Sequence, residues 1–419
     1  MHYQVIIVGA GTGGIMTAAQ MLKRNPKLNI AIIDPAETHY YQPAYTLVGA
    51  GDFDFEKTKR STASLIPKGA IWIKDYVDNV FPDKNTLTTR KSGDFSYEIL
   101  VLSPGLVNNL DAIEGLREAV EKKVVCSNYI DPRETWRQLQ AFKGGNAIFT
   151  MPTTPIKCGG GPQKIAYLTA DYLRKNGLDK KSNIVFATPG SVIFGVKEIR
   201  ETLEDVIRRY GIKFKPGYAP VKIDATKKTV TFKLVGPNEN KYVVTTDNDI
   251  KEIVSGDATV EIPFDFLHLA PPQEAPAFIK TNQLLANETG WLDVDINTLQ
   301  HKRFENIFGI GDAAAIPTAK TGAAVRKQVP VIVESIFNLL NGKAISEKRY
   351  EGYSSCPLVT GYGKMVLAEF DYKNNFTPDP KLKQLLIWNS DKEHYRLWLL
   401  KKYMLPHLYW NKMMKGINV

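Results

Sequence analysis

The sequence predicts an α/β protein with two Rossmann-like domains and a C-terminal amphipathic helical segment, and three observations lead to this prediction. First, 419 residues exceed what one hydrophobic core usually organises. Second, the chain opens with an apolar strand, a glycine-rich turn and a helical pattern, and a further α/β stretch begins near Asn146. Third, basic and aromatic residues are concentrated in its last part.

The N-terminal turn has the residues that dinucleotide binding requires. Residues 5–8 (Val-Ile-Ile-Val) are typical of a buried parallel strand, and residues 9–14 (Gly-Ala-Gly-Thr-Gly-Gly) lead directly into a helical pattern. Gly9 permits a tight turn, Gly11 lets backbone N–H groups approach a pyrophosphate, and Gly14 allows the helix to pack closely on the strand. This opening therefore predicts a dinucleotide site.

Two acidic residues at strand ends favour FAD as the dinucleotide. A second strand, residues 29–33, ends in Asp34, where the ribose hydroxyls need an acceptor. Much later, the apolar strand in residues 306–314 ends in Gly-Asp at Asp312, which in two-domain flavoproteins faces the ribityl and pyrophosphate groups of FAD. A turn capped by an aspartate is the alternative for Asp312. With the N-terminal turn, the pattern predicts one discontinuous FAD-binding domain, residues 1–112 and 286–375.

Residues 113–285 are predicted to form a second Rossmann-like domain whose nucleotide site is degenerate. A flavoenzyme that uses a pyridine nucleotide would carry a second glycine fingerprint here, and we expect it after the strand at residues 183–187. Residues 188–195 read Thr-Pro-Gly-Ser-Val-Ile-Phe-Gly instead, with proline and bulky side chains where glycines should meet phosphate. Electrons are therefore not expected to come from NAD(P)H.

The C-terminal segment, residues 376–419, is predicted to bind a membrane surface. From Pro380 onward it has eight Lys or Arg against two acidic residues, within a net charge of +10, and it holds three of the six tryptophans. The charge therefore points to a membrane rather than to nucleic acid. Packing on the protein's own core or on a second subunit is the alternative, and Pro406 is expected to separate two short helices. No apolar run reaches the roughly 18 residues that span a bilayer.

The chain has three cysteines, which excludes a disulfide scaffold, and their spacing indicates no metal site. Cys158 and Cys356 each lie beside glycine or proline in a run that reads as an exposed loop. Two such thiols in a flavoprotein indicate redox chemistry on sulfur, and a basic membrane-facing tail suggests quinone as the electron acceptor. Two unrelated cysteines, one of them buried, remain the alternative.

These motifs together resemble the sulfide:quinone oxidoreductase family, in its mitochondrial-type branch, from Tyr3 to about Trp410. The most specific are residues 39–43 (His-Tyr-Tyr-Gln-Pro), 153–163, 308–312, 356–362 (Cys-Pro-Leu-Val-Thr-Gly-Tyr) and 408–411 (Leu-Tyr-Trp-Asn). The resemblance implies a glutathione reductase-like fold and a monotopic FAD enzyme that oxidises hydrogen sulfide to a persulfide and reduces ubiquinone, menaquinone or a related quinone. It also implies that Cys158 and Cys356 form the redox disulfide.

The resemblance assigns individual roles as well. Cys356 would receive the sulfide sulfur and Cys158 would face the flavin, although the reverse order stays open. Cys126 is expected to be a spectator, and Phe370 and Tyr372 are candidate quinone neighbours or ordinary strand aromatics. The expected cofactor-binding residues are Gly9, Gly11, Thr12, Gly13, Gly14, Asp34, Gln42, Val77, Asp312, Gly322, Ala323, Ala324 and Val325.

Two other functions share this frame: a type II NADH:quinone dehydrogenase, and a flavin-bound membrane scaffold or sensor without turnover. The degenerate second fingerprint and the paired cysteines speak against the dehydrogenase. The presence of both chemical ends of the reaction in the sequence speaks against the scaffold. The sulfur acceptor is left open among glutathione, sulfite, coenzyme A, cyanide and polysulfide, and a homo-oligomer is compatible with the sequence. The expected location is a bacterial cytoplasmic membrane, or the mitochondrial inner membrane if a presequence has been omitted.

Overall fold

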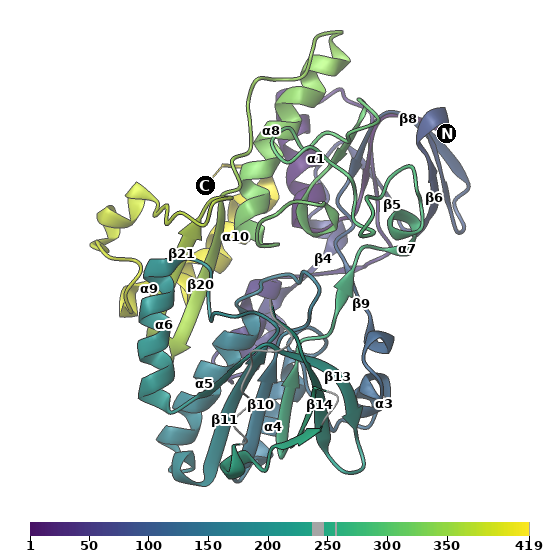
Figure 1. Cartoon of the computed structure of the whole chain (residues 1–419). Coiled ribbons are helices and arrows are strands. Elements are labelled where there is room, and N and C mark those ends of the chain that lie inside the picture. Colours follow the sequence, from purple (N-terminus) through teal and green to yellow (C-terminus); the bar gives the residue numbers. More distant parts are fainter. Residues whose placement is uncertain (237–246, 256–257, 419) are drawn as a thin grey trace.

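The first half of the molecule is built on a seven-stranded sheet with the order β5-β2-β1-β8-β7-β6, in which β19 also pairs with β8 (Figure 1). The computed structural model describes residues 1–236, 247–255 and 258–418. The strands are β1 (His2–Val8), β2 (Ile30–Ile33), β5 (Ala70–Ile73), β6 (Val77–Phe81), β7 (Thr86–Thr89), β8 (Asp94–Leu102) and β19 (Ile307–Gly309). β1 pairs in parallel with β2 and β8, and its residues are buried on both faces, as is usual in a parallel sheet.

Two helices distant in sequence cover this sheet together. α1 (Thr12–Arg24) follows the glycine-rich turn, and α8 (Gly322–Leu340) packs against it. β19 joins the sheet in parallel register, with Ile307 opposite Leu100. The N-terminal and late segments therefore share one core, which also contains Ala275, Ile279 of α7 (Ala277–Lys280) and Leu285. The domain boundaries given above stay a prediction.

The second half contains a parallel sheet with the order β12-β11-β10-β17. Its strands are β10 (Gly145–Thr150), β11 (Ser182–Thr188), β12 (Lys213–Pro216) and β17 (Phe266–Leu269), and its helices include α5 (Gly161–Lys175) and α6 (Lys197–Tyr210). This is the Rossmann order 3-2-1-4, so β10 is the first strand. The expected position of the second fingerprint, after β11, was therefore wrong: the first strand-to-helix turn is residues 151–160.

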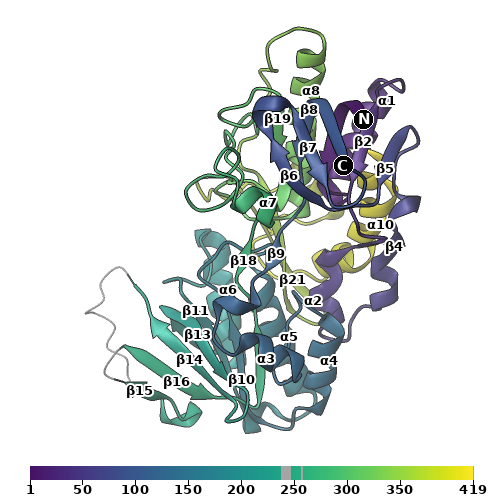
Figure 2. The same cartoon turned by 90° about the vertical axis from the view of Figure 1, so that its right-hand side faces the viewer.

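An antiparallel sheet lies beside the parallel one, with the order β13-β14-β16-β15 (Figure 2). Its strands are β13 (Tyr218–Asp224), β14 (Thr229–Leu234), β15 (Ile253–Ser255) and β16 (Thr259–Pro263). Residues 237–246 and 256–257 of the predicted second domain lie outside the described residues. Two short strands, β9 (Val107–Asn108) and β18 (Gln273–Glu274), pair where the chain passes between the halves.

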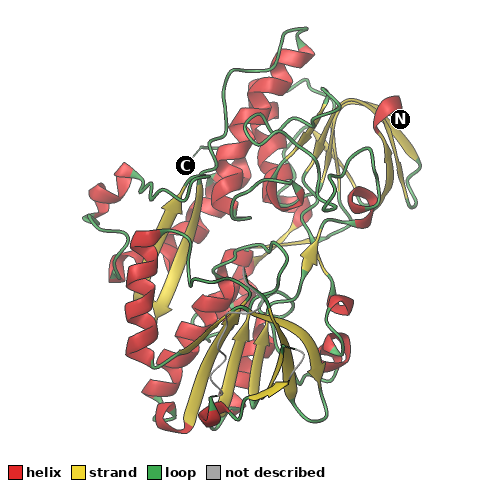
Figure 3. Ribbon diagram, viewed as in Figure 1, coloured by secondary structure: helices red, strands yellow, loops and turns green. Residues whose placement is uncertain are grey.

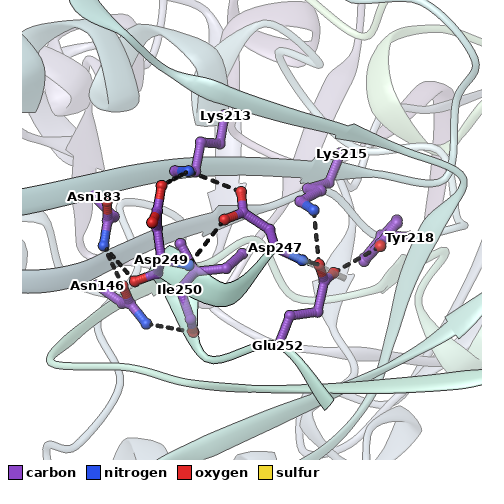
Figure 4. Close-up of polar contacts among 9 residues, drawn as sticks. All are labelled: Asn146, Asn183, Lys213, Lys215, Tyr218, Asp247, Asp249, Ile250 and Glu252. Atoms are coloured by element: carbon purple, nitrogen blue, oxygen red, sulfur yellow. Dashed lines mark hydrogen bonds and ion pairs between the residues drawn. The ribbon is translucent and has the colours of Figure 1, made fainter. Parts of the chain in front are cut away.

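A polar cluster fastens residues 247–252 to the parallel sheet (Figure 4). Lys215 donates to the buried Glu252 carboxylate over 2.8 Å, and Asn146 donates to the Ile250 carbonyl over 2.9 Å. Because Asn146 lies at the start of β10, this cluster is at the amino ends of the parallel strands. The turn after β10 is at the opposite edge, so the cluster supports the domain without reaching the thiols.

A C-terminal hairpin stands beside α5 and α6 (Figure 3). It consists of β20 (Ser354–Gly361) and β21 (Lys364–Phe370), and β20 packs on α5. The smaller elements of the chain are β3 (Thr38–Tyr40), β4 (Lys59–Ser61), α2 (Tyr45–Val48), α3 (Leu116–Glu121) and α4 (Pro132–Ala141). The hairpin is what carries Cys356 to the second half of the molecule.

The tail is helical, but Pro406 does not separate two helices as expected. α9 (Tyr395–Leu399) continues through a π-helical turn (Leu400–Met404) into α10 (Leu405–Asn411). Pro406 falls at the start of α10, where its missing N–H is tolerated after the wider turn. Among the residues described, none of the helices combines the length and apolar character needed to cross a bilayer.

Candidate active site

The turn between β1 and α1 has the shape of a phosphate cradle. Gly9 has a φ of +106°, and a Cβ atom there would lie 2.2 Å from the Ser103 carbonyl oxygen. A Cβ atom on Gly14 would lie 1.8 Å from the Gly9 oxygen, so the helix start packs directly on the turn. Gly11, in contrast, has nothing within 4 Å of its Cβ position. The space beside Gly11 and the N-terminus of α1 fits a pyrophosphate.

Asp34 lies immediately after β2, at the edge of this cradle. One carboxylate oxygen accepts the Ala10 N–H over 2.7 Å, and the other accepts the Ala36 N–H over 2.7 Å. Each oxygen keeps lone-pair capacity for a hydroxyl group. The carboxylate is therefore oriented where a ribose acceptor is needed.

Gln42 and Val77 lie at the margin of the same half. Gln42 begins a short helical turn (Gln42–Ala44) after β3, and its side chain is exposed. Val77 begins β6 and packs half-buried against the first core. Neither position conflicts with a contact to a bound flavin.

Asp312 is half-buried directly after β19, between two lysines. Burial raises the pKa of its carboxyl group, and the positive charges of Lys320 and Lys157 oppose this effect. Lys320 Nζ donates to the Asp312 carbonyl over 2.6 Å and to the Ala314 carbonyl over 3.0 Å. Burial also lowers the pKa of Lys320 to about 8. The Gly-Asp turn is thus held in place by Lys320, and two lysine charges act on the Asp312 carboxyl group.

The start of α8 offers fewer amide groups than the sequence suggested. Thr321 caps the helix, because its hydroxyl accepts the Ala324 N–H over 3.1 Å, and the Val325 N–H bonds to the Thr321 carbonyl. The amides of Gly322 and Ala323 have no carbonyl partner within the helix. Nothing lies within 4 Å of the Gly322 Cβ position. Gly322 and Ala323 are therefore the members of this run that fit an electron-rich ring.

Cys158 lies in the turn between β10 and α5. Its φ of +50° is unusual for a residue with a side chain. Its N–H donates to the Lys320 carbonyl over 2.9 Å, and its own carbonyl accepts the Gly161 N–H and the Tyr129 hydroxyl. These bonds hold the thiol turn against the segment that leads into α8.

Cys356 does not lie in an exposed loop, which corrects the sequence interpretation. It is in β20, only 2% exposed, opposite Ala368. The Cys-Pro pair suggested a loop because proline cannot donate to a ladder. However, the hairpin has only two strands, so Pro357 lies in an edge strand, where its missing N–H is tolerated. The sequence interpretation expected little apolar bulk around the sulfur, but Cys356 belongs to a hydrophobic core cluster.

Lys164 lies close to both sulfur atoms and interacts with each of them. It lies in the first turns of α5, is 1% exposed, and its Nζ is 2.9 Å from Cys158 Sγ and 3.7 Å from Cys356 Sγ. A hydrogen bond from the Cys356 thiol and the Lys164 charge hold the pKa of Cys158 well below its usual range, against the effect of burial. Donating that bond, together with burial, raises the pKa of Cys356. Of the two thiols, Cys158 is therefore the one that loses its proton more readily.

Lys401 is a further cation at this site that the sequence interpretation missed. It is 3% exposed and its Nζ donates to the Pro43 carbonyl over 3.1 Å. Burial and the nearby Lys164 charge lower its pKa to about 7, while the two sulfurs act in the opposite direction. Leu397, one helical turn earlier, is fully buried. The four-residue spacing was the signal that Lys401 faces inward.

The remaining candidates, Cys126, Phe370 and Tyr372, make contacts within the protein itself. Cys126 is 2% exposed, hydrogen bonds to the Leu267 carbonyl over 3.5 Å, and has its pKa raised by burial. Phe370 meets Phe194 edge-on at 6.0 Å, and the Tyr372 hydroxyl donates to the Ile296 carbonyl over 2.5 Å. All three are held by the protein's own groups. The spectator role of Cys126 stays a prediction.

A family model for pyridine nucleotide-disulphide oxidoreductases matches residues 3–331. The mitochondrial sulfide:quinone oxidoreductase of Mus musculus is 39% identical over 418 residues, which cover 99% of this chain and 87% of that protein. The chain belongs to the sulfide:quinone oxidoreductase family. The family's Dictyostelium discoideum member, named likewise, is 37% identical over 417 residues, covering 99% of this chain and 86% of that protein. Membership of the family implies a flavin cofactor.

A solved structure of the sulfide:quinone oxidoreductase from Aquifex aeolicus has the same fold. It superimposes with a TM-score of 0.79 at 21% identity, covering 99% of this chain and 92% of that chain. The predicted family and the predicted α/β flavoprotein fold are thereby confirmed.

Proposed function

We propose that this chain is an FAD-dependent sulfide:quinone oxidoreductase that binds a membrane peripherally. The observation that carries the proposal is the thiol pair around buried Lys164, which contacts Cys158 in the first turn of the second Rossmann-like sheet and Cys356 in β20. The relatives that share the whole chain are named for sulfide and quinone. A cysteine pair of unequal pKa beside a proposed flavin cradle supports the same chemistry.

FAD is the flavin that the cradle fits best, since a dinucleotide needs both the β1–α1 turn and Asp34. We propose that Gly9, Gly11, Thr12, Gly13 and Gly14 hold the pyrophosphate, and that Asp34 binds the adenosine ribose. Gln42, Val77, Asp312, Gly322 and Ala323 are the proposed contacts to the remaining parts, whereas the amides of Ala324 and Val325 are already bonded to Thr321. When bound, FAD would accept two electrons from sulfur and pass them to quinone.

The sulfur chemistry would start from a Cys158–Cys356 disulfide. A hydrosulfide ion attacks Cys356 Sγ, the S–S bond breaks, and Cys158 leaves as a thiolate that keeps the electron pair. Lys164 stabilises that leaving group, and Cys356 holds the new sulfur as a persulfide. A nucleophilic acceptor then takes the outer sulfur and leaves Cys356 as a thiolate. Re-forming the disulfide from the two thiolates would release two electrons, and a bound flavin would accept them.

The first part of the tail supplies the proposed membrane contact. Its exposed apolar side chains are Leu385, Leu386, Trp388, Tyr395, Tyr403 and Met404, with exposures between 38% and 67%. Lysines and an arginine lie among them, as in segments that rest in a headgroup layer. Contact with the membrane would bring the protein to a lipid-soluble quinone.

An anaerobic titration tests the function. Sulfide added to the purified flavoprotein is expected to bleach the flavin absorbance, and quinone is expected to restore it. NADH should leave the flavin oxidised, because the turn after β10 carries Cys158 instead of a glycine fingerprint. Bleaching by NADH and not by sulfide would favour the dehydrogenase alternative, and no bleaching by either would favour a scaffold.

A further inference from the structure

Two segments that lie far apart in sequence meet beside the dinucleotide turn. His39 in β3 and Tyr409 in α10 are joined by a hydrogen bond of 2.5 Å between the ring Nε2 and the hydroxyl. The same hydroxyl lies 2.7 Å from Oγ1 of Thr12, the first residue of α1. His39 Nδ1 lies 3.0 Å from the Ala10 carbonyl. Four groups thus form a chain that begins and ends in the turn.

The direction of this hydrogen-bond chain follows from its two ends. The Ala10 carbonyl can only accept, so the Nδ1 atom of His39 carries the proton. Burial lowers the pKa of His39, against smaller effects of the Ala10 carbonyl and Asp34, so the ring is neutral and Nε2 accepts. Tyr409 therefore donates to His39, and Thr12 donates to Tyr409. The Thr12 hydroxyl is turned toward the tail, which leaves backbone amides to meet an anion at the turn.

Packing makes the contact specific to the end of the tail. Tyr409 is 5% exposed and its ring centroid lies 4.7 Å from that of Tyr41. The following short helix (Met413–Lys415) packs on α1, so the end of the chain lies close to that helix (Figure 2). Gln20 of α1 also donates to Asn418 over 2.8 Å. This end of the chain is therefore part of the wall of the dinucleotide half. The exposed apolar residues of the tail precede it.

We propose that Tyr409 is a positioning residue for the cofactor turn, and that FAD binding and docking of the C-terminal end stabilise each other. This inference rests on the FAD site proposed above. Tyr409 fixes the Thr12 side chain and closes the wall, so an ordered turn favours the docked tail. A pyrophosphate that orders the same turn must then favour docking as well, because coupling between two sites is reciprocal.

The test compares Tyr409→Phe with Tyr403→Phe in the full-length protein. Both variants remove one hydroxyl from the tail, but Tyr403 is 61% exposed. Titration of apoprotein with FAD, followed by flavin fluorescence, is expected to show about fivefold to tenfold weaker binding for Tyr409→Phe, since one buried hydrogen-bonded group is removed. Tyr403→Phe should bind like the unmodified protein.

A second measurement follows the tail itself. Lys412 and Lys415 are exposed, so trypsin reports undocking at this end. FAD is expected to slow cleavage there in the unmodified protein, and to slow it less in Tyr409→Phe. A Thr12→Val variant should lose FAD affinity to a similar degree, and the double variant should lose little more than either single one.

Equal FAD affinity in the two tyrosine variants would overturn the inference, as would tail cleavage that FAD does not change. Additive losses in the double variant would contradict the bond between Thr12 and Tyr409. Neither measurement uses sulfide or quinone, so the inference can fail while the proposed reaction stands. Apoprotein that takes up no FAD would overturn both.

Discussion

The turn after the first strand differs between the two Rossmann-like sheets, although its place in the topology is the same. Residues 9–11 connect β1 to α1, whereas residues 151–160 connect β10 to α5. The short turn exposes backbone beside Gly11 and suits an anion held by amides. The long turn instead places a side chain, Cys158, beside the start of its helix. One topology thus carries either backbone recognition or side-chain chemistry, and the length of the turn separates them.

The two turns also differ in how a negative charge would be stabilised at each of them. A pyrophosphate is an external anion, which the helix N-terminus and hydrogen bonds stabilise without a buried cation. A thiolate is part of the chain and is formed in apolar surroundings, where an unpaired charge is strongly unfavourable. Lys164, 1% exposed, supplies the missing positive charge at the second turn. The buried position of this lysine is what a thiolate at the second turn would require.

The largest expected effect comes from removing a sulfur. Cys356→Ala deletes the proposed disulfide and leaves the first turn untouched, so the protein should retain FAD. Sulfide-dependent flavin reduction in stopped-flow measurements is expected to fall by at least about a thousandfold. Cys126→Ala is the matched control and should keep its rate. Rapid flavin reduction in Cys356→Ala, or its loss in Cys126→Ala, would show that the sulfurs are misassigned.

Spectra of the same series distinguish the two cysteines. A thiolate next to oxidised flavin gives a charge-transfer absorbance band. Cys356→Ala removes the hydrogen bond that lowers the pKa of Cys158 most, but the Lys164 charge and the proposed place beside the flavin remain, so the band is expected to persist and to strengthen as the pH rises. Cys158→Ala should lose it. A band that persists in Cys158→Ala would reverse the two roles.

The second prediction removes the charge that distinguishes the second turn. In Lys164→Met, the pKa of Cys158 is expected to return toward the ordinary range, which lowers the thiolate fraction at pH 7 by about thirtyfold. The rate of iodoacetamide alkylation of the reduced protein measures this fraction. Lys175→Met, on the exposed side of the same helix, should alkylate normally. An unchanged rate in Lys164→Met would mean that Cys356 alone sets the pKa.

The two turns were not equally predictable from sequence. The first is local: strand, glycines and helix follow one another within residues 5–22, and Asp34 is only one strand away. The second depends on contacts that no short window contains. Cys356 reaches Cys158 through a hairpin that packs on α5, and Lys401 reaches both from the tail. Proline beside Cys356 masked its strand, because an edge position cannot be recognised without the fold.

The third prediction replaces one glycine in each turn with alanine. Alanine at Gly160 would place a Cβ atom 2.7 Å from Cys356 Sγ and 2.6 Å from the Leu358 side chain, although its φ of −80° suits any residue. Gly160→Ala should therefore slow sulfide oxidation about tenfold while FAD affinity is retained. Gly11→Ala should fold normally and weaken FAD binding about tenfold, roughly 1.4 kcal/mol.

Gly159 provides the control for this pair, since nothing lies within 4 Å of its Cβ position. Gly159→Ala should leave the thermal midpoint and the alkylation rate of the reduced thiols unchanged. If Gly160→Ala weakens FAD binding, or Gly11→Ala alters thiol alkylation, the two turns are not independent. The two turns would then be coupled, and the hydrogen bond from the Cys158 N–H to the Lys320 carbonyl is the contact that could couple them.

The smallest expected effect belongs to Lys401 of the tail, which interacts with the two sulfurs and has a pKa of about 7. Its folded pKa lies below that of an unfolded lysine, so the unfolded state binds more protons between about pH 7 and 10.5. The contribution of Lys401 to the free energy of unfolding therefore rises with pH across this window. Below pH 7 the lysine is charged in both states, and its burial destabilises the fold in full. In Lys401→Met, urea unfolding should show a shallower increase of stability over the same range.

The same titration predicts a pH effect on the reaction. Below pH 7 the Lys401 ammonium attracts the hydrosulfide ion and favours the thiolate, whereas above pH 7 the neutral amine resembles methionine. The ratio of flavin-reduction rates, unmodified protein over Lys401→Met, cancels the titration of sulfide itself. We expect this ratio to be about threefold to tenfold at pH 6 and to approach one above pH 8. A ratio that stays constant with pH would assign Lys401 to packing, and Lys164 alone would then supply the charge of the second turn.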